Sequence, residues 1–313
     1  MKTNLIYILG MMCLSGTVSA QTTVNYTEFE QKVLDYSQTL KQSVSQRTAM
    51  QKAMKAAKTA FFPAVDATGS YQYRINKYDM DFGGMAVPME HDSYSAEVGV
   101  VQPIYAGGSI YHTYKASQIQ SQIADKSVDL TTDNLIYAAE ASYWGTAAQK
   151  EMYKTMCQYV EIISQLTKVL QDKYDDGYIS KTDLIQMQTR LKEAELQRSS
   201  SYQSYQIALQ NMNVLMGLEP DKEVGLVDSI FVELPLPAYV GADAALNVRP
   251  DYAISQLDVD YQKRQVKLAA AKYNPSLSIG FKETWGTQML NISGETMFNS
   301  NVYASVKLPL FHW

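Results

Sequence analysis

Apolar and polar residues alternate along four short stretches of the chain, which form two widely separated pairs. In the first pair, residues 65–76 and 93–100, apolar or small side chains occupy every second position. Residues 277–285 and 302–308 repeat this alternation near the end of the sequence. A period of two predicts β-strands with one apolar and one polar face. On alternation alone, strands that face a membrane and the edges of a soluble antiparallel sheet are about equally well supported.

Between the two pairs of strands, the sequence has the periodicity of long helices. Residues 109–173 contain no proline and one glycine, which predicts a helix about 95 Å long at about 1.5 Å per residue. A turn, YDDGYISKTD, separates it from a second predicted helix over residues 182–216. Apolar or small residues recur in this second helix at coiled-coil spacing, although Arg198 and Ser201 interrupt them. The sequence therefore predicts a long helical hairpin.

The chain repeats its own pattern after 212 residues. LDYSQTLKQS from Leu34 aligns with LNVRPDYAIS from Leu246, and KTAFFPAV aligns with AAKYNPSL. Further along, AEVGVVQPIY matches VYASVKLPLF. In each copy a predicted helix, over residues 27–62 and 243–274, ends before a proline, where helices usually stop. Two strands then follow the helix in both copies, which indicates an internal structural repeat.

These elements divide the chain into four segments. The first is a secretory signal peptide, because Lys2, an apolar stretch and a small-residue cleavage site before Gln21 occur in that order. The remaining segments are two repeats and the linker between them. They cover residues 21–217 (first repeat, with a strand pair over 64–102 and the helical hairpin over 109–216), 218–242 (linker) and 243–313 (second repeat, incomplete, with a strand pair over 276–310).

Composition and charge exclude several functional classes. Without Lys2 the chain carries 26 Lys and Arg against 32 acids, a net charge of 26 − 32 = −6, whereas nucleic-acid binding requires a basic face. Cys157 is the one cysteine after the signal peptide, so no internal disulfide is expected. His91, His112 and His312 are scattered without the spacing of metal ligands, and no nucleophile lies in a recognisable setting. Neither an enzyme nor a cofactor is predicted.

In their order and spacing, several short motifs resemble those of the TolC-type outer membrane efflux proteins. They are the helix–strand junctions FFPAV and YNPSL, the strand exits QPIYAGG and LPLF, the turn DGYISKTDLIQ and the closing NVLMG. The resemblance runs from about Thr22 to Phe311. It implies a mainly α fold with a small β part: a long α-helical hairpin that lines a periplasmic tunnel, and four membrane β-strands that would join a trimeric 12-stranded β-barrel. Three chains are needed because an open sheet edge in lipid leaves backbone groups unpaired.

The function that the resemblance implies is that of an outer membrane efflux duct, in multidrug efflux or type I secretion. Such a trimeric channel conducts substrates from a periplasmic and inner-membrane pump complex across the outer membrane. Its partners are two further copies, a periplasmic adaptor (membrane fusion) protein, an inner-membrane pump and outer membrane lipid. The alternative is a periplasmic coiled-coil adaptor or structural protein of a pump, which requires compact β-rich domains on both sides of one hairpin.

The resemblance also assigns candidate site residues to the turn between the hairpin helices. Asp183 matches an acidic residue that helps to hold the periplasmic entrance closed and favours cations. In three copies, it would form acidic rings with two neighbouring carboxylates, those of Asp175 and Asp176. From the residues alone, capping and solvation at a helix turn explain these acids more simply. The expected contact with the adaptor lies at the tip and comprises Gly177, Tyr178 and Ile179, where Tyr178 replaces the family's usual aliphatic residue.

Aromatic residues near the strand ends are the remaining candidates. They would form girdles at the two membrane interfaces, or they are simply large residues that cap a core. One group comprises Phe61, Phe62, Tyr105, Tyr273 and Phe311, and the other comprises Tyr78, Phe82 and Trp285.

The family pattern continues beyond LPLF with a glycine and a second helical hairpin, which residues 1–313 do not contain. That hairpin supplies half of the tunnel wall in the family. The expectation from sequence is therefore a fragment that does not make a working duct by itself.

Overall fold

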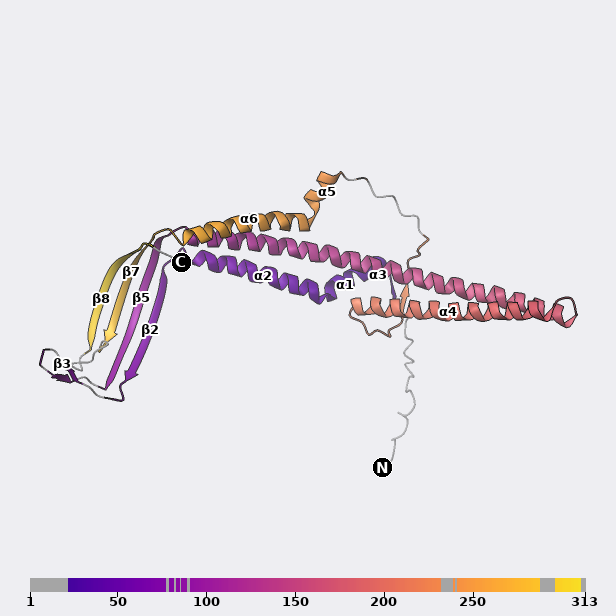
Figure 1. Ribbon diagram of the computed structural model, residues 1–313, viewed down its shortest axis with the longest axis horizontal. Coiled ribbons are helices and arrows are strands. Elements are labelled where there is room, and N and C mark those ends of the chain that lie inside the picture. The colour runs from indigo at the N-terminus through magenta and orange to yellow at the C-terminus, as the bar shows by residue number, and fades with distance from the viewer. Residues whose placement is uncertain are drawn as a thin grey trace, which may run out of the picture. The chain divides into compact units, whose positions relative to one another are not determined.

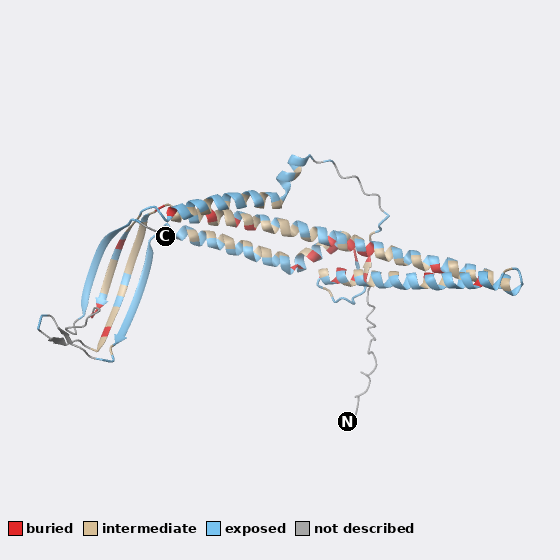
Figure 2. Cartoon of the chain, viewed as in Figure 1, coloured by how far each residue is buried: buried red, intermediate tan, exposed pale blue. Residues whose placement is uncertain are grey.

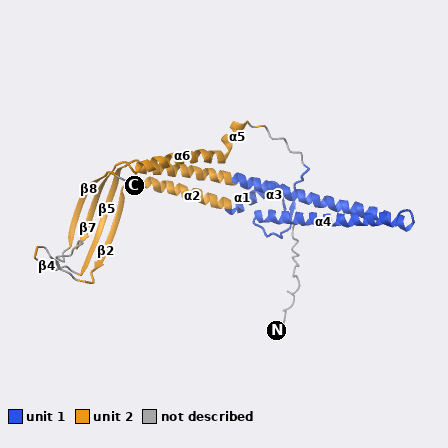
Figure 3. Cartoon of the chain, viewed as in Figure 1, with its two compact units in different colours: residues 1–38, 132–237 blue, residues 39–131, 238–313 orange. Residues whose placement is uncertain are grey.

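The computed structural model describes residues 22–76, 79–81, 83–84, 86–88, 91–231, 239, 241–287 and 296–310 (Figure 1). The predicted signal peptide and three residues of the predicted girdles, Tyr78, Phe82 and Phe311, lie outside this part of the chain. Long helices and a small four-stranded sheet dominate the described residues, which confirms the predicted mainly helical fold with a small β part. The chain divides into two compact units, residues 1–38 with 132–237 and residues 39–131 with 238–313 (Figure 3).

The first unit is built from long helices and two very short strands. Its elements are β1 (Thr22–Val24), α1 (Tyr26–Tyr36), the later part of α3 (Ser109–Asp175), α4 (Lys181–Leu215) and β6 (Val224–Leu226). The strands β1 and β6 pair in parallel, with Val24 opposite Leu226. Buried residues gather where these elements meet (Figure 2), around the side chains of Phe29, Tyr143 and Met212.

A buried tyrosine joins three separate segments of the first unit. The hydroxyl group of Tyr143 lies 2.7 Å from Asp228 Oδ2 and 3.1 Å from the carbonyl oxygen of Val24. The same carboxylate oxygen accepts a hydrogen bond from the backbone N–H of Tyr26, at 2.8 Å. Burial raises the pKa of Tyr143 well above its usual value, and the hydrogen bond to Asp228 raises it further. Asp228 therefore connects the start of α1 with the middle of α3.

The end of α4 closes the same unit through a glycine and an asparagine. Gly217 has φ +72°, and the N–H of Leu218 donates to the carbonyl of Asn213 at 2.9 Å, which is the Schellman arrangement of a helix end. The fully buried Asn213 donates from Nδ2 to the carbonyls of Pro220 (3.0 Å) and Lys222 (2.7 Å). These bonds turn the chain back so that β6 can pair with β1.

The second unit combines three helices with an antiparallel sheet. Its elements are α2 (Gln38–Thr59), β2 (Ala64–Tyr73), β3 (Asp79–Asp81), β4 (Ala86–Pro88), β5 (Asp92–Ala106), the first part of α3, α5 (Ala242–Val248), α6 (Pro250–Ala271), β7 (Ser276–Gly286) and β8 (Met297–Lys307). The sheet has the order β2-β5-β7-β8, and β3 and β4 form a separate small pair. None of the described helices is long and apolar enough to cross a membrane.

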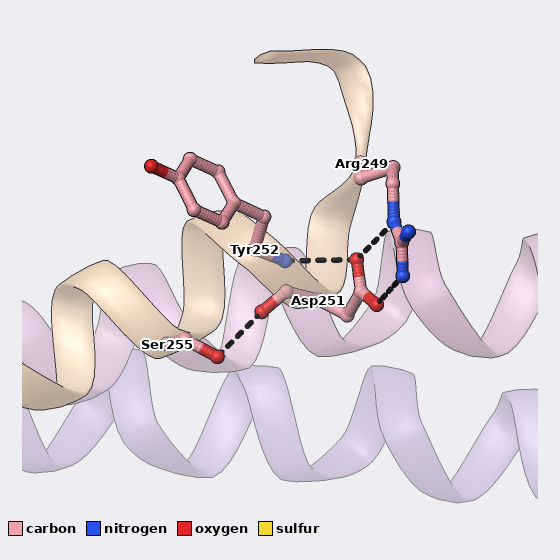
Figure 4. A network of polar contacts seen from close by, with 4 residues as sticks. All are labelled: Arg249, Asp251, Tyr252 and Ser255. Atoms are coloured by element: carbon pink, nitrogen blue, oxygen red, sulfur yellow. Dashed lines mark hydrogen bonds and ion pairs between the residues drawn. The ribbon is translucent and has the colours of Figure 1, made fainter. Parts of the chain in front are cut away.

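A proline sets the start of α6. Arg249 has extended backbone angles, as expected for a residue before proline, and Pro250 occupies the first helical turn. The guanidinium group of Arg249 makes a two-point contact with the carboxylate of Asp251, which also accepts the backbone N–H of Tyr252 at 2.8 Å (Figure 4). Arg249 holds the pKa of Asp251 below its usual range. The predicted single helix over residues 243–274 is therefore wrong, because the chain bends at Arg249 between α5 and α6.

The predicted helix over residues 27–62 is also interrupted. Ser37, with ψ 115°, separates α1 from α2. The hydrophobic periodicity of the sequence continues through Ser37, so the periodicity does not indicate that the helix is interrupted there. The division matters because α1 belongs to the core of the first unit, whereas most of α2 belongs to the second.

The register of the sheet places the four apolar strand sets on one common face. One row of directly opposed residues crosses all four strands, from Val65 through Val100 and Phe281 to Val302. The next row, shifted by one residue, consists of Asp66, Gly99, Lys282 and Asn301. Because side chains alternate between the two faces, the sheet has one largely apolar and one polar face. Glu283 also lies on the apolar face, where its carboxylate accepts a hydrogen bond from the hydroxyl group of Ser300.

Candidate functional site

The tip of the hairpin begins where α3 ends. The N–H of Tyr178 donates to the carbonyl of Lys173 at 2.8 Å, and the N–H of Gly177 donates to the carbonyl of Tyr174 at 2.9 Å. This pair of bonds is a Schellman motif, and its left-handed position is Gly177, with φ +82°. Glycine is required there because an L side chain is strained at such an angle. The two backbone hydrogen bonds and the left-handed angle of Gly177 thus fix the shape of the turn.

A capping box begins the next helix, α4. The side chain of Ser180 accepts the backbone N–H of Asp183 at 3.2 Å, and Asp183 Oδ2 accepts the backbone N–H of Ser180 at 3.3 Å. The hydroxyl group of Ser180 also lies 2.7 Å from Asp183 Oδ2. The side chain of Asp183 is therefore engaged in the helix start, which is the simpler role that the sequence indicated for it.

The structure brings the predicted tip residues together within one short, exposed turn. The carboxylate of Asp175 accepts a hydrogen bond from Gln171 at 3.0 Å, and Asp176 follows it directly on the exposed surface. Tyr178 is 81% exposed, whereas Ile179 is half-buried and the nearby Leu184 is buried. The tip consequently presents carboxylates and one aromatic ring to the surroundings, on a turn that the Schellman motif and the capping box hold in place.

The aromatic candidates lie near the two ends of the sheet. Phe61, Phe62, Tyr105 and Tyr273 occupy the end at which the helices join the strands, and 41–67% of their surface is exposed. Near the opposite end, the ring of Trp285 lies 5.5 Å from that of Tyr94. All five candidates that fall within the described residues are thus at strand ends, and none is in a closed core.

The polar face of the sheet carries a site that sequence reasoning missed. A cavity of about 550 Å³ is lined by residues from all four strands, among them Ser70, Glu97, Lys282 and Asn301. Glu97 and Lys282 form an ion pair at 2.6 Å, and the hydroxyl groups of Ser70 and Ser95 lie 2.8 Å apart. Since residues of every strand line one cavity, this face is the concave one. Glu97 lies opposite Thr284 and Lys282 lies opposite Gly99, so the ion pair is diagonal and depends on the strand register, which the sequence alone does not specify.

Candidate metal ligands do not cluster in the described part of the chain. Among the described residues, no group of three or more His, Cys, Asp or Glu side chains could hold a metal ion. Cys157 is a half-buried free thiol on α3.

Comparison with known proteins identifies related sequences and structures. The family model described as "Outer membrane efflux protein" matches residues 30–218. No curated protein matches the chain significantly.

Solved outer membrane channels share the fold. The CmeC outer membrane channel of Campylobacter jejuni matches with a TM-score of 0.77 at 17% identity, over 92% of this chain and 62% of that one. The outer membrane protein VceC of Vibrio cholerae matches with a TM-score of 0.73 at 14% identity, over 92% and 69%. The open state of the MtrE outer membrane channel of Neisseria gonorrhoeae matches with a TM-score of 0.60 at 18% identity, over 92% of this chain and 64% of that one. The chain thus spans less than two thirds of the length of two of these structures.

Proposed function

Since the chain belongs to the outer membrane efflux protein family, we propose that it supplies the membrane sheet and a tunnel-lining helical hairpin of an outer membrane efflux duct. In this proposal the duct conducts substrates that a periplasmic and inner-membrane pump complex delivers. The observation that carries the proposal is the register of the sheet, which places apolar residues on one face and polar residues on the other.

The two faces of the sheet suit two different solvents. The convex apolar face carries exposed side chains such as Val302, which is 78% exposed, and these are stable against lipid. The concave polar face carries the Glu97–Lys282 ion pair and suits a water-filled passage. A soluble sheet would instead be expected to cover its apolar face with a helix or a second sheet.

The open edges of the sheet support assembly from three copies. All residues of the two edge strands, β2 and β8, are exposed. Unpaired backbone groups at such edges are costly in lipid, and closure removes them. Pairing of β8 with β2 of the next copy would close a barrel of twelve strands when three copies combine.

The aromatic residues at the strand ends match the thickness of a membrane. In the sheet, Tyr105 lies opposite Leu277, and Trp285 lies eight positions after Leu277 along β7. At about 3.3 Å per residue this separation is about 26 Å, close to the apolar band of about 25 Å of outer membrane barrels. We therefore assign Phe61, Phe62 and Tyr273 to one interface and Trp285 to the other. Residues 1–20 are proposed to direct export before they are removed.

The hairpin tip is proposed to be the end that meets the pump. Gly177, Tyr178 and Ile179 would contact the periplasmic adaptor, with the exposed ring of Tyr178 as the main apolar contact. Three copies of Asp175, Asp176 and Asp183 would surround the entrance with carboxylates, which favour cations over anions. These assignments rest on the family resemblance together with the exposure of the tip.

Replacing all three tip carboxylates by amides is expected to reduce the cation selectivity of the duct several-fold. Asp175→Asn, Asp176→Asn and Asp183→Asn keep the size of each side chain and remove its charge, so the loss reports electrostatics. The measurement is the reversal potential in a salt gradient, recorded on single channels of the protein purified from the outer membrane of its own source.

A matched variant removes three exposed acids elsewhere on the same helices, with Asp133→Asn, Glu161→Gln and Glu193→Gln. This control should retain the cation selectivity of the unaltered protein. Unchanged selectivity in the tip variant would overturn the assignment of the tip as the entrance. Absence of any conductance from the protein as its source assembles it in the outer membrane would overturn the duct itself.

A further inference from the structure

The ends of three helices next to the sheet are rich in basic residues. The last 13 residues of α2 (47–59), the first 13 of α3 (109–121) and the 13 that end at Ala271 in α6 contain eight Lys or Arg and one acid, Asp260. The whole chain has more acids than bases, 32 against 27. We call these cations the basic collar: Arg47, Lys52, Lys55, Lys58, Lys115, Lys263, Arg264 and Lys267.

Four cations of the basic collar line a groove between α3 and α6. A cavity of about 620 Å³ there is lined by Lys115 from α3 and by Lys263, Arg264 and Lys267 from α6. Asp260 also lines it and forms an ion pair with Lys263 at 2.9 Å. Four cations and one carboxylate leave the groove with a net charge of 4 − 1 = +3.

Most of this charge has no acidic partner. Within the described part of the chain, no carboxylate oxygen lies within 4.0 Å of the charged nitrogen atoms of Lys115, Arg264 or Lys267. Lys115 Nζ donates instead to the neutral side chain of Gln118, at 3.0 Å. Burial lowers the pKa of His112 on α3, and the positive charges of Lys267 and Arg264 lower it further. The groove is thus a region of positive potential.

The groove lies on the opposite side of the α3–α6 pair from a second cavity. This second cavity is lined by α2, α3 and α6 together, and there Gln120 donates to the hydroxyl group of Tyr261 at 3.0 Å. Lys263 follows Tyr261 by two positions in α6, which corresponds to a rotation of about 200° around the helix axis. The side chain of Lys263 therefore points to the opposite side of the helix from Tyr261. If the side that all three helices share lines the lumen of the proposed duct, the groove faces outward.

The groove also lies close to the sheet. Lys267 precedes the end of α6 by four residues, about 6 Å of helix, and Lys115 follows the start of α3 by six residues, about 9 Å. Along the chain, Tyr273 lies between the cations of α6 and β7, and Tyr105 lies at the end of β5 that leads into α3. Long Lys and Arg side chains can extend over such distances to reach a membrane interface.

We propose that the basic collar, through the groove between α3 and α6, binds the phosphate headgroups of anionic phospholipids in the leaflet that meets the helix ends of the sheet. The inference rests on the proposed position of the sheet in a membrane. Basic pockets beside membrane-spanning segments hold anionic headgroups by charge attraction and hydrogen bonding. The collar would fix the depth of the sheet and anchor the helices at the membrane surface.

The test compares lipid binding by the full chain and two variants. Native mass spectrometry of the detergent-solubilised protein measures the binding of phosphatidylglycerol and phosphatidylcholine. The unaltered chain should prefer phosphatidylglycerol. Each cation near an anionic surface contributes about a factor of five, so Lys263→Gln, Arg264→Gln and Lys267→Gln together should reduce this preference by up to about a hundredfold. The matched control Lys168→Gln, Lys173→Gln and Arg190→Gln removes the same charges from the hairpin and should leave the preference unchanged.

Two further arms separate the possible failures. Flotation with phosphatidylcholine vesicles tests insertion, and a chain that does not float with them overturns both the membrane position and the collar. A chain that floats but binds both lipids equally, or loses its preference equally in both variants, overturns the collar alone. Displacement of phosphatidylglycerol by millimolar inorganic phosphate would show that the groove is a site for free phosphate, and would overturn the lipid assignment.

Discussion

Replacing Gly217 with alanine should lower the free energy of unfolding of the first unit by about 3 kcal/mol. The left-handed backbone angle at Gly217 costs about 1–2 kcal/mol for an L residue, and overpacking costs about 1–3 kcal/mol more. The second cost arises because an added Cβ would lie 2.3 Å from the ring of Tyr36. Amide hydrogen exchange over residues 209–226, which include the end of α4 and β6, measures the loss.

Gly177 provides the matched control for this substitution. It also ends a helix in a Schellman motif, with φ +82°, but none of the described atoms lies within 4 Å of a Cβ added there. Gly177→Ala should therefore carry only the backbone cost, about 1–2 kcal/mol. Equal losses at the two positions would show that the ring of Tyr36 moves aside freely, and would contradict close packing at the end of α4.

Replacing Asp228 with alanine should lower the same free energy of unfolding by about 2–3 kcal/mol, because hydrogen bonds to a charged acceptor contribute about 1.5–3 kcal/mol. The substitution leaves the N–H of Tyr26 without its acceptor and removes the closest partner of the buried Tyr143 hydroxyl group. Urea unfolding followed by the fluorescence of Trp144, which packs against the core of the first unit, measures the effect.

Two further variants show whether the effect of Asp228 is specific. Combined with Tyr143→Phe, Asp228→Ala should give less than the sum of the two single losses, because the two side chains share one hydrogen bond. The exposed Asp221, which accepts only a surface hydrogen bond from Gln210, should tolerate alanine within about 0.5 kcal/mol. Additive losses at Asp228 and Tyr143 would contradict the direct link between them.

The larger elements could be predicted because their periodicity is strong. Alternation over about ten residues assigns Val65, Val100, Phe281 and Val302 to the apolar sides of their strands, and the register then joins them in one row. The long helices follow from the near absence of proline and glycine over α3 and α4. Gly177 marks the hairpin turn because it supplies the left-handed angle that the turn requires.

The parts that sequence reasoning missed depend on contacts between distant residues. β1 and β6 have three residues each, too few for a period of two to be recognised, and they pair across 202 positions. The hydrogen bond between Asp228 and the N–H of Tyr26 is equally distant in the sequence. The basic collar is visible as separate lysines, but its groove exists only because α3 and α6 lie together.

For the acidic residues of the hairpin tip, the sequence predicts where they lie better than it predicts what they do. The sequence places Asp183 at the start of the second hairpin helix, and the structure adds that its carboxylate caps that helix together with Ser180. Each copy contributes one Asp183 carboxylate, so a ring of these carboxylates at the entrance requires neighbouring copies. The role of Asp183 at the entrance therefore stays a prediction, which the reversal potentials test.

The orientation of the sheet in the membrane is the central claim, and a nitroxide scan along β8 tests it most directly. Single cysteines at positions 298–306 of the full chain, with Cys13 and Cys157 replaced by serine, are labelled in vesicles made from native outer membranes. The proposed duct predicts that oxygen reaches labels at even positions such as Val302 and Ala304, whereas a water-soluble nickel complex reaches labels at odd positions such as Asn301. Equal access of the nickel complex to both sets, or release of the protein by a salt wash, would contradict a sheet with one face in lipid.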